Sequence, residues 1–277
     1  MSAVVVTGAS GFVGRAVVAE LRRRGVTVAA VSRQSLAGGV TVADYADAPG
    51  GDVLVHLAEP SDRAAARKLG ADHVHRTALT LQTLLAKGYG KTVYASSAVV
   101  YEDDSPSPRR VGDPTPTDDP YARAKRRCES EVSAAGGAVA RLANLFGPGM
   151  ASSNAISTIL AQIPGEGAVE VWDDEPVRDF LWVDDAAEAI ASMALSSEKG
   201  IFNVGSGEGN SIGAVARTAL AIAGDEARPV VATKPSGRRS HLVLDIEDTR
   251  RRLGWTPRTS LADGLRQLIG KREKGRA

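Results

Sequence analysis

The amino-acid sequence predicts an α/β fold: a Rossmann-type, doubly wound parallel sheet joined to a smaller mixed α/β C-terminal lobe. In the first half of the chain, short apolar runs alternate with amphipathic stretches, which is typical of parallel strands covered by helices. A glycine-rich turn lies between the first apolar run and the first helical stretch. Beyond Gly149 the β-like runs become short and helical stretches dominate. We therefore expect a core over residues 1–148 and, over residues 149–277, a lobe that is interleaved with it.

The core elements follow from apolar runs and the residues that end them. Residues 3–7 are predicted to form a buried strand, and a helix over about 12–24 ends at Gly25. Further core elements are strands at 26–31, 40–42, 53–56, 92–96 and 139–142, and helices at 61–87 and 121–135. The lobe is predicted to hold helices at 153–163, 185–195, 211–223 and 260–270, with β-like runs at 169–172 and 202–204. Residues 102–120, with five prolines and five aspartates, are predicted to form a polar loop.

Composition excludes several classes of protein. The 277 residues include 34 Lys+Arg and 33 Asp+Glu, which argues against a nucleic-acid or membrane-surface binder, because such proteins need an excess of positive charge. The single cysteine, Cys128, excludes an intrachain disulfide, and the four histidines lack HExxH spacing, so no metal is expected. The chain has neither a run of ~20 apolar residues nor a secretion-signal layout at its start. We expect a soluble, cytoplasmic protein.

The glycine-rich turn has the sequence Gly8-Ala-Ser-Gly11-Phe-Val-Gly14 and connects the first strand to the first helix. In that context the first glycine permits the tight turn and the second lets a pyrophosphate approach backbone amides. The third lets helix and strand pack closely. A dinucleotide-binding site is predicted here, with a purely structural turn as the alternative.

The end of the second strand bears on the choice between NAD and NADP. An acidic residue there accepts hydrogen bonds from the ribose 2′-hydroxyl, whereas an arginine accommodates a 2′-phosphate. This chain has Ser32-Arg33 and no carboxylate. The pattern favours NADP over NAD, and the alternative is that Arg33 is a solvated loop residue.

Tyr121 and Lys125 are four residues apart, so they share one face of the predicted helix. An ammonium about 4 Å from a phenolate stabilises it by roughly 4 kcal/mol at an effective dielectric near 20, which suits proton exchange with a sugar oxygen near neutral pH. Ser97, at the end of the 92–96 strand, would polarise the same oxygen. A surface Tyr–Lys pair is the alternative, but the order of glycine turn, serine and Tyr/Lys pair favours catalysis.

These residues resemble an extended short-chain dehydrogenase/reductase of the NAD-dependent epimerase/dehydratase family, over nearly the whole chain. The matching segments are TGASGFVG, DVLVHLAE, SSAVVY, PYARAK, RLANLFGPG, RDFLWVDDAA, IFNVGSG and LGWTPRTSLADGL. The resemblance implies hydride transfer at a sugar carbon, giving ketoreduction, epimerisation or dehydration. It also implies a dinucleotide-binding core over 1–148 and a mainly substrate-binding lobe over 149–277.

The resemblance assigns residues to the reaction, the cofactor and the substrate. It implies that Ser97, Tyr121 and Lys125 are catalytic. The expected cofactor contacts are Gly8, Ser10, Gly11, Phe12, Val13, Gly14, Ser32, Arg33, Asp44, Tyr45, Leu57, Ala58, Glu59, Ala95, Tyr121 and Lys125. The expected contacts to a nucleotide-linked sugar are Ser97, Ala98, Asn144, Arg178 and Arg238. Two alternatives stay open: Arg178 in a local ion pair with Asp179, and Arg239 in place of Arg238.

Several positions depart from the family pattern. Ala98-Val99 after Ser97 lacks the acidic pair of the dehydratases, so dehydration is disfavoured. Glu102 replaces a glycine, and His73 replaces an asparagine that contacts the cofactor region. His56 and Cys128 are expected to have structural roles.

The predicted function is NAD(P)-dependent 4-ketoreduction or 4-epimerisation of a nucleotide-linked sugar. The absence of a carboxylate at position 32 tilts the choice toward a reductase, since NADPH is the usual exchangeable reductant. The alternatives are an enzyme acting on a free sugar, sugar acid or other small carbonyl compound, and a non-catalytic NAD(P)-binding regulator. Helices 71–87 and 121–135 resemble the pair with which family members dimerise, so a homodimer is expected.

Overall fold

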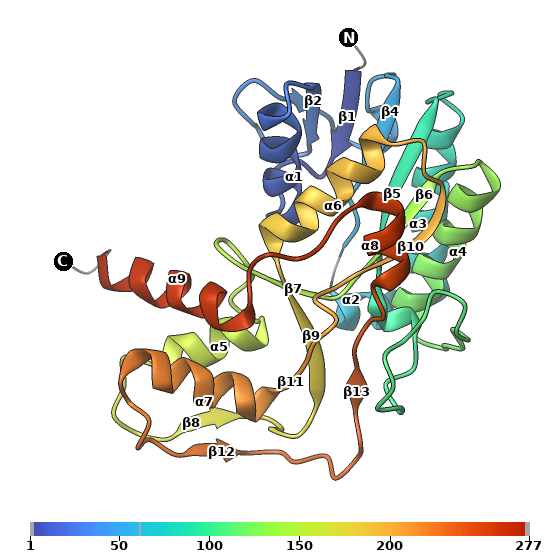
Figure 1. Cartoon of the computed structure of the whole chain (residues 1–277). Coiled ribbons are helices and arrows are strands. Elements are labelled where there is room, and N and C mark those ends of the chain that lie inside the picture. Colours follow the sequence, from blue (N-terminus) through green and yellow to red (C-terminus); the bar gives the residue numbers. More distant parts are fainter. Residues whose placement is uncertain (1–2, 61, 275–277) are drawn as a thin grey trace.

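A computed structural model describes residues 3–60 and 62–274. Its centre is a seven-stranded sheet in which every neighbouring pair of strands is parallel (Figure 1). The order is β10-β6-β5-β4-β1-β2-β3, the strand order of a doubly wound fold with a seventh strand at one edge. The strands are β1 (Ala3–Thr7), β2 (Thr27–Ser32), β3 (Val40–Thr41), β4 (Val53–His56), β5 (Lys91–Ser97), β6 (Ala138–Leu142) and β10 (Gly200–Val204).

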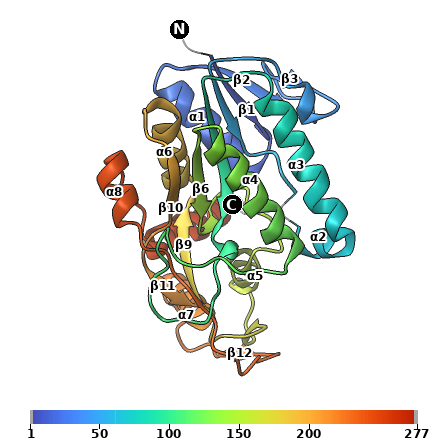
Figure 2. The ribbon, with the colours of Figure 1, turned by 90° about the vertical axis from the view of Figure 1, so that its right-hand side faces the viewer.

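Helices cover both faces of this sheet (Figure 2). On one face lie α1 (Phe12–Arg23) and α6 (Val183–Leu195), and on the other α3 (Ala71–Leu85) and α4 (Pro120–Ala134). The alternation of β1 side chains reflects this layering, since Val4 and Val6 share a cluster with α1 and α6, whereas Val5 packs with Leu84 of α3. Strands buried on both faces need continuous apolar runs, which is why the Ala3–Thr7 segment could be recognised.

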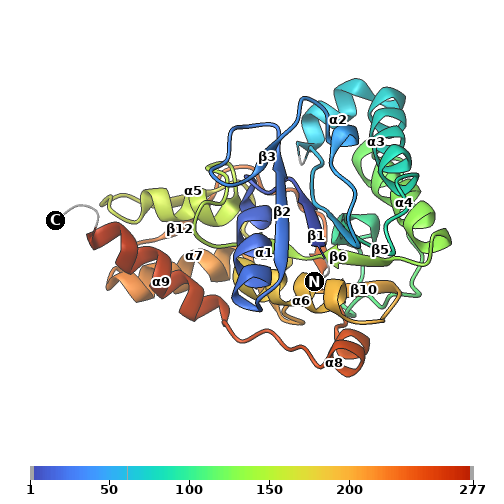
Figure 3. The same ribbon diagram turned by 90° about the horizontal axis from the view of Figure 1, so that it is seen from above.

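The C-terminal lobe has its own apolar core, gathered away from α3 and α4 (Figure 3). Phe146 and Trp182 meet edge to face there, with ring centroids 5.3 Å apart. The lobe elements are β7 (Asn144–Phe146), α5 (Ala155–Gln162), β8 (Val169–Val171), β9 (Val177–Trp182), β11 (Gly209–Ser211), α7 (Ile212–Ala223), β12 (Val230–Ala232), β13 (His241–Leu242) and α9 (Leu261–Lys274). Strand β9 pairs with β7, β11 and β13, and it packs against α6 of the core, which connects the lobe to the core.

Several sequence expectations need correction. The helix expected at 185–195 in the lobe is α6, which packs beside α1 on the core sheet, and the strand β9 was not expected. The single helix expected over 61–87 is two helices, α2 (Arg63–Leu69) and α3, because Gly70 has a φ of 58° and breaks the helix; residue 61 lies outside the described residues. The β-like run at 202–204 belongs to β10, which pairs with β6 in the core sheet rather than in the lobe. The helix α8 (Glu247–Leu253) was not expected, since its seven residues are too few for a clear apolar period.

Within residues 3–60 and 62–274, the structure contains no helix whose length and apolar character would let it cross a membrane.

Candidate active site

A cavity of about 720 Å³ opens at the carboxyl ends of β1, β2 and β4. We call it the glycine-turn cavity. The predicted cofactor residues that line it are Gly8, Ser10, Gly11, Arg33, Asp44, Tyr45, Leu57, Ala58 and Glu59. Helix α3 contributes a further wall, which includes His73. One cavity therefore brings together residues from five separate segments of the sequence.

The glycines of the turn are required by close backbone approach. Gly8 has a φ of 75°, which favours glycine, and its carbonyl accepts a hydrogen bond from the Gly11 N–H at 2.9 Å. A Cβ on Gly14 would lie 2.0 Å from that same carbonyl oxygen. Phe12 and Val13 form the first turn of α1, whose N-terminus suits an anion.

The end of β2 and the loops that follow β2 and β3 have two roles: some residues support the glycine turn and others line the cavity. Ser32 is fully buried and donates a hydrogen bond to Ser10 Oγ at 2.7 Å, so it holds the turn from behind. The Arg33 guanidinium lies 5.3 Å from the centre of the Tyr45 ring, and both residues line the cavity. The Asp44 carboxylate accepts from the Ala46 N–H at 2.8 Å, so its side chain also shapes the backbone of this wall.

Tyr121 and Lys125 face inward from α4. Lys125 Nζ lies 2.5 Å from Glu59 Oε2 and donates to the Ala95 carbonyl at 2.8 Å. It also lies 5.6 Å from the centre of the Tyr121 ring. Tyr121 is only 9% exposed, and its ring stacks with that of His73 at a centroid distance of 6.4 Å. The alternative of a solvent-exposed Tyr–Lys pair is therefore wrong.

The Lys125 ammonium forms an ion pair with the buried carboxylate of Glu59. Burial by itself lowers the pKa of Lys125, but Glu59 outweighs this and holds the pKa above its ordinary value. Burial likewise raises the pKa of Glu59, and Lys125 reverses the shift to below the ordinary value. Both groups are therefore charged near neutral pH. The spacing of residues in the sequence could not predict this ion pair, because Glu59 follows β4 whereas Lys125 lies on α4.

A second cavity, of about 580 Å³, contains all five predicted substrate residues, and we call it the substrate cavity. They are Ser97, Ala98, Asn144, Arg178 and Arg238. Lys125 donates to the backbone carbonyl of Ala95, which lies two residues before Ser97 on β5. The end of β5 therefore connects the substrate cavity to Lys125.

Asp103 links the two arginines of the substrate cavity. Both of its carboxylate oxygens accept from Arg238, each at 2.9 Å, and one also accepts from Ser240 Oγ at 2.5 Å. Arg178 lies 3.4 Å from the same carboxylate and donates to Ser240 Oγ at 2.6 Å. Burial raises the pKa of Asp103, but hydrogen bonds from Arg238 and Ser240 lower it to about 2. Asp103 was not among the predicted substrate contacts, and its only signal in the sequence is the acidic run at 102–104.

The two alternatives for the arginines are resolved. Asp179 follows Arg178 on a strand and so points to the opposite side, where it accepts from the backbone N–H groups of Ser206, Gly207 and Leu244. Arg238, and not Arg239, lines the cavity.

Two further arginines were missed because they lie on the short helix α2. Arg63 and Arg67 line the substrate cavity, and both contact the Asp119 carboxylate, at 3.0 and 2.8 Å. Asp119 also accepts from the Tyr121 N–H at 3.0 Å and caps α4. The contacts therefore tie this wall of the cavity to the helix that carries Tyr121.

The structure also gives the contacts and burial of the other residues discussed from the sequence, namely Cys128, His56, His73 and Glu102. Cys128 is fully buried in an apolar cluster, which confirms its predicted packing role. His56 is 1% exposed, contacts Thr7 Oγ1 at 2.7 Å, and burial lowers its pKa to about 4. Burial also lowers the pKa of His73. The Glu102 carbonyl accepts from Arg109 Nε at 3.0 Å, which holds the start of the 102–120 loop.

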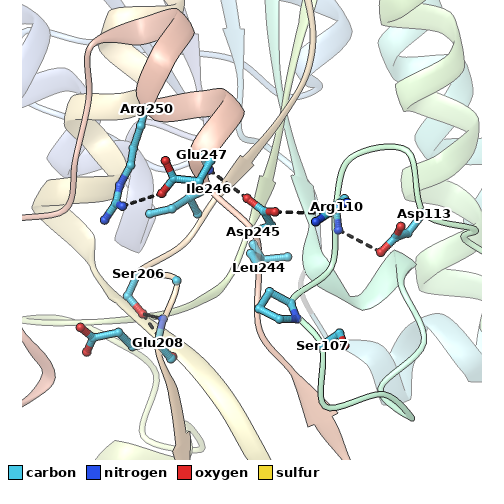
Figure 4. A pocket seen from close by; sticks show the side chains of 12 residues that line it. Ser107, Arg110, Asp113, Ser206, Glu208, Leu244, Asp245, Ile246, Glu247 and Arg250 are labelled. Atoms are coloured by element: carbon cyan, nitrogen blue, oxygen red, sulfur yellow. Dashed lines mark hydrogen bonds and ion pairs between the residues drawn. The ribbon is translucent and has the colours of Figure 1, made fainter.

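A third cavity, of about 700 Å³, lies beside the end of β10 (Figure 4). Its charged groups bind one another: Arg110 is 3.4 Å from Asp245, and Arg250 donates to Glu247 at 2.7 Å. Of the predicted site residues within the described part of the chain, none lines this cavity. We assign it no part in the reaction.

Comparisons with known proteins agree with this arrangement. The model of the NAD dependent epimerase/dehydratase family matches residues 4–205. The dTDP-L-rhamnose 4-epimerase of Burkholderia thailandensis is 32% identical over 47% of this chain and 38% of that enzyme. The UDP-glucose 4-epimerase of Corynebacterium glutamicum is 27% identical over 92% of this chain and 90% of that enzyme. The structure of RMD from Pseudomonas aeruginosa, complexed with NADPH, has a TM-score of 0.84 and 26% identity over 99% of this chain and 100% of that one.

The family match spans most of the parallel sheet and includes the glycine turn, Ser97 and the Tyr121–Lys125 pair. The chain therefore belongs to the NAD-dependent epimerase/dehydratase family and is an enzyme of the extended short-chain dehydrogenase/reductase type.

Proposed function

We propose that this enzyme uses a nicotinamide dinucleotide to reduce or epimerise a nucleotide-linked hexose at a ring carbon, with 4-ketoreduction favoured over 4-epimerisation. The observation that carries the proposal is the position of the Tyr121–Lys125 pair between two cavities. Glu59 and His73 contact the pair and line the glycine-turn cavity. The Ala95 carbonyl that binds Lys125 lies two residues before Ser97, which lines the substrate cavity.

The residues of the glycine-turn cavity fit a dinucleotide. Gly8, Gly11 and the N-terminus of α1 would hold the pyrophosphate, and Arg33 with Tyr45 would hold the adenosine end. Bound there, the cofactor supplies or accepts the hydride. The exposed Arg33 favours NADP, and a similar structure contains NADPH.

The chain's own catalytic groups handle the proton. Tyr121 exchanges it with the sugar oxygen, Ser97 donates a hydrogen bond to the same oxygen, and the Lys125 ammonium stabilises the phenolate. Dehydration is disfavoured because Ala98 and Val99 follow Ser97 without an acid.

The four arginines of the substrate cavity support an anionic substrate. Arg63, Arg67, Arg178 and Arg238 all line the cavity, and paired guanidinium groups suit a diphosphate. Two relatives are epimerases of nucleotide-linked sugars.

Asp103 favours a second candidate substrate. Its carboxylate already neutralises Arg178 and Arg238, and a diphosphate would have to displace it. A free sugar, sugar acid or other small carbonyl compound would leave this ion cluster intact.

The experiment is turnover of NADPH and NADH by the purified protein with a panel of 4-keto sugar nucleotides and small carbonyl compounds. We expect NADPH-dependent reduction of a sugar nucleotide, and a 10²- to 10⁴-fold lower rate in Tyr121→Phe. Tyr89→Phe is the matched control, since its hydroxyl binds only the Pro49 carbonyl on another part of the surface.

An unchanged rate in Tyr121→Phe contradicts the proposed mechanism. Turnover of small carbonyl compounds alone favours the second candidate, and binding without any turnover favours a regulator. Fluorescence titration that finds tighter binding of NADH than of NADPH overturns the NADP preference.

A further inference from the structure

The two oxygens of the Glu59 carboxylate have different surroundings. Oε2 contacts Lys125 Nζ at 2.5 Å and accepts from the Tyr94 hydroxyl at 2.9 Å. Among the described residues, 3–60 and 62–274, Oε1 has no hydrogen-bond partner, although the side chain is only 8% exposed. His56 Nε2 is 3.9 Å from it, which is too far for a hydrogen bond. A buried, charged oxygen without a donor is costly, so this atom is suited to accept a hydrogen bond from a bound molecule.

The glycine-turn cavity lets such a donor reach Glu59. Glu59 and His56 both line the glycine-turn cavity, together with Gly8 and Gly11. Glu59 also holds Lys125, which lies beside Tyr121. Its free oxygen is therefore at the reaction end of the cavity, away from the Arg33–Tyr45 wall.

The chemistry of Oε1 restricts what can bind it. A carboxylate oxygen accepts hydrogen bonds and donates none. A phosphate or a substrate carbonyl has no proton to offer, whereas a hydroxyl does. On a dinucleotide, the hydroxyls nearest the reacting ring are those of the ribose that carries the nicotinamide.

Building on the proposed function, we propose that Glu59 is a positioning residue with one task for each oxygen: Oε2 holds Lys125 beside Tyr121, and Oε1 accepts a hydrogen bond from a hydroxyl of the nicotinamide ribose. Lys125 has three N–H groups, of which one binds Glu59 and one binds the Ala95 carbonyl. One remains for the cofactor. Recognition of the ribose is therefore divided between a cation and an anion.

A binding cycle tests the proposal without turnover. Dissociation constants are measured by fluorescence for the wild type and Glu59→Gln, using NADPH or NADH, whichever binds the wild type more tightly. The same titrations use two analogues, which lack the 2′- or the 3′-hydroxyl of the nicotinamide ribose. In the wild type, one analogue should bind at least tenfold more weakly than the parent cofactor. In Glu59→Gln, that analogue and the parent should bind within twofold of each other.

An equal ratio of parent to analogue in both proteins overturns the proposal, even where the variant has a lower melting temperature. A purely structural ion pair gives that result, because its loss weakens the binding of the parent cofactor and of both analogues by the same factor. Where Glu59→Gln does not fold, Glu59→Asp serves instead: it keeps a charge near Lys125 but withdraws the oxygens by one methylene, and it should also lose the discrimination.

Glu188→Gln is the matched control, since Glu188 contacts Arg258 at 3.0 Å on α6, and its discrimination should equal that of the wild type. The two proposals fail differently. A wild type that binds neither NADPH nor NADH overturns both, whereas tight binding with no dependence on ribose hydroxyls overturns only the role of Glu59.

Discussion

Protonation of the buried His56 imidazole, at the end of β4, makes the stability of the fold depend on pH. Its ring is 1% exposed, contacts Thr7 Oγ1 at 2.7 Å, and faces Glu59 and Lys125. Burial lowers its pKa to about 4, against about 6.5 for an unfolded histidine. Between these values the unfolded state binds more protons than the folded state, so stability falls as the pH falls through the window from 6.5 to 4.

We predict that lowering the pH from 7 to 5 removes about 2 kcal/mol of stability through His56. Urea unfolding at both pH values checks this. His56→Gln should show a smaller loss between them, and the exposed His75→Gln should behave as the wild type. Equal losses in His56→Gln and wild type would contradict the assignment. The buried His73 adds a loss of the same sign.

At the scale of elements, the unit formed by β1, the glycine turn and α1 depends on contact between backbones. The N-terminal half of α1 lies against the turn because Gly14 has no side chain. A larger residue there would push the helix away from the Gly8 carbonyl. This would move the amide groups that are proposed to face the pyrophosphate.

We predict that Gly14→Ala weakens dinucleotide binding at least tenfold and lowers the melting temperature, since its Cβ would lie 2.0 Å from Gly8 O. Gly50→Ala is the matched control, because a Cβ at this exposed position meets nothing within 4 Å. Fluorescence titration and thermal unfolding provide both measurements. Wild-type affinity in Gly14→Ala would show that the turn does not hold the cofactor.

At the scale of the whole molecule, α3 and α4 lie side by side on the outer face of the core (Figure 2). Leu79 of α3 is 52% exposed. Burial of a large apolar side chain by a partner would stabilise the complex. The homodimer through these two helices stays a prediction.

Size-exclusion chromatography with light scattering at micromolar concentration tests it. We expect a dimer for the wild type and a monomer for Leu79→Asp. Leu195→Asp, a similarly exposed position on α6 at the opposite face of the sheet, should remain dimeric. A monomeric wild type would refute the prediction.

Features that depend on neighbouring residues could be predicted from the order of amino acids alone. The glycine turn, the shared helix face of Tyr121 and Lys125, and the apolar strands of the sheet each result from local geometry with a fixed period or spacing. These features predicted the doubly wound sheet. The family resemblance added five residues that line the substrate cavity, but not Asp103, Arg63 or Arg67.

Which charged groups form ion pairs is apparent only in the folded chain. The pairs Glu59–Lys125 and Asp103–Arg238 join segments that are distant along the chain. No period or spacing encodes such contacts, because they exist only once the sheet order and the loops bring the groups together. For the same reason, the assignment of β10 to the core sheet required the fold, since a short apolar run specifies a strand but not its neighbour.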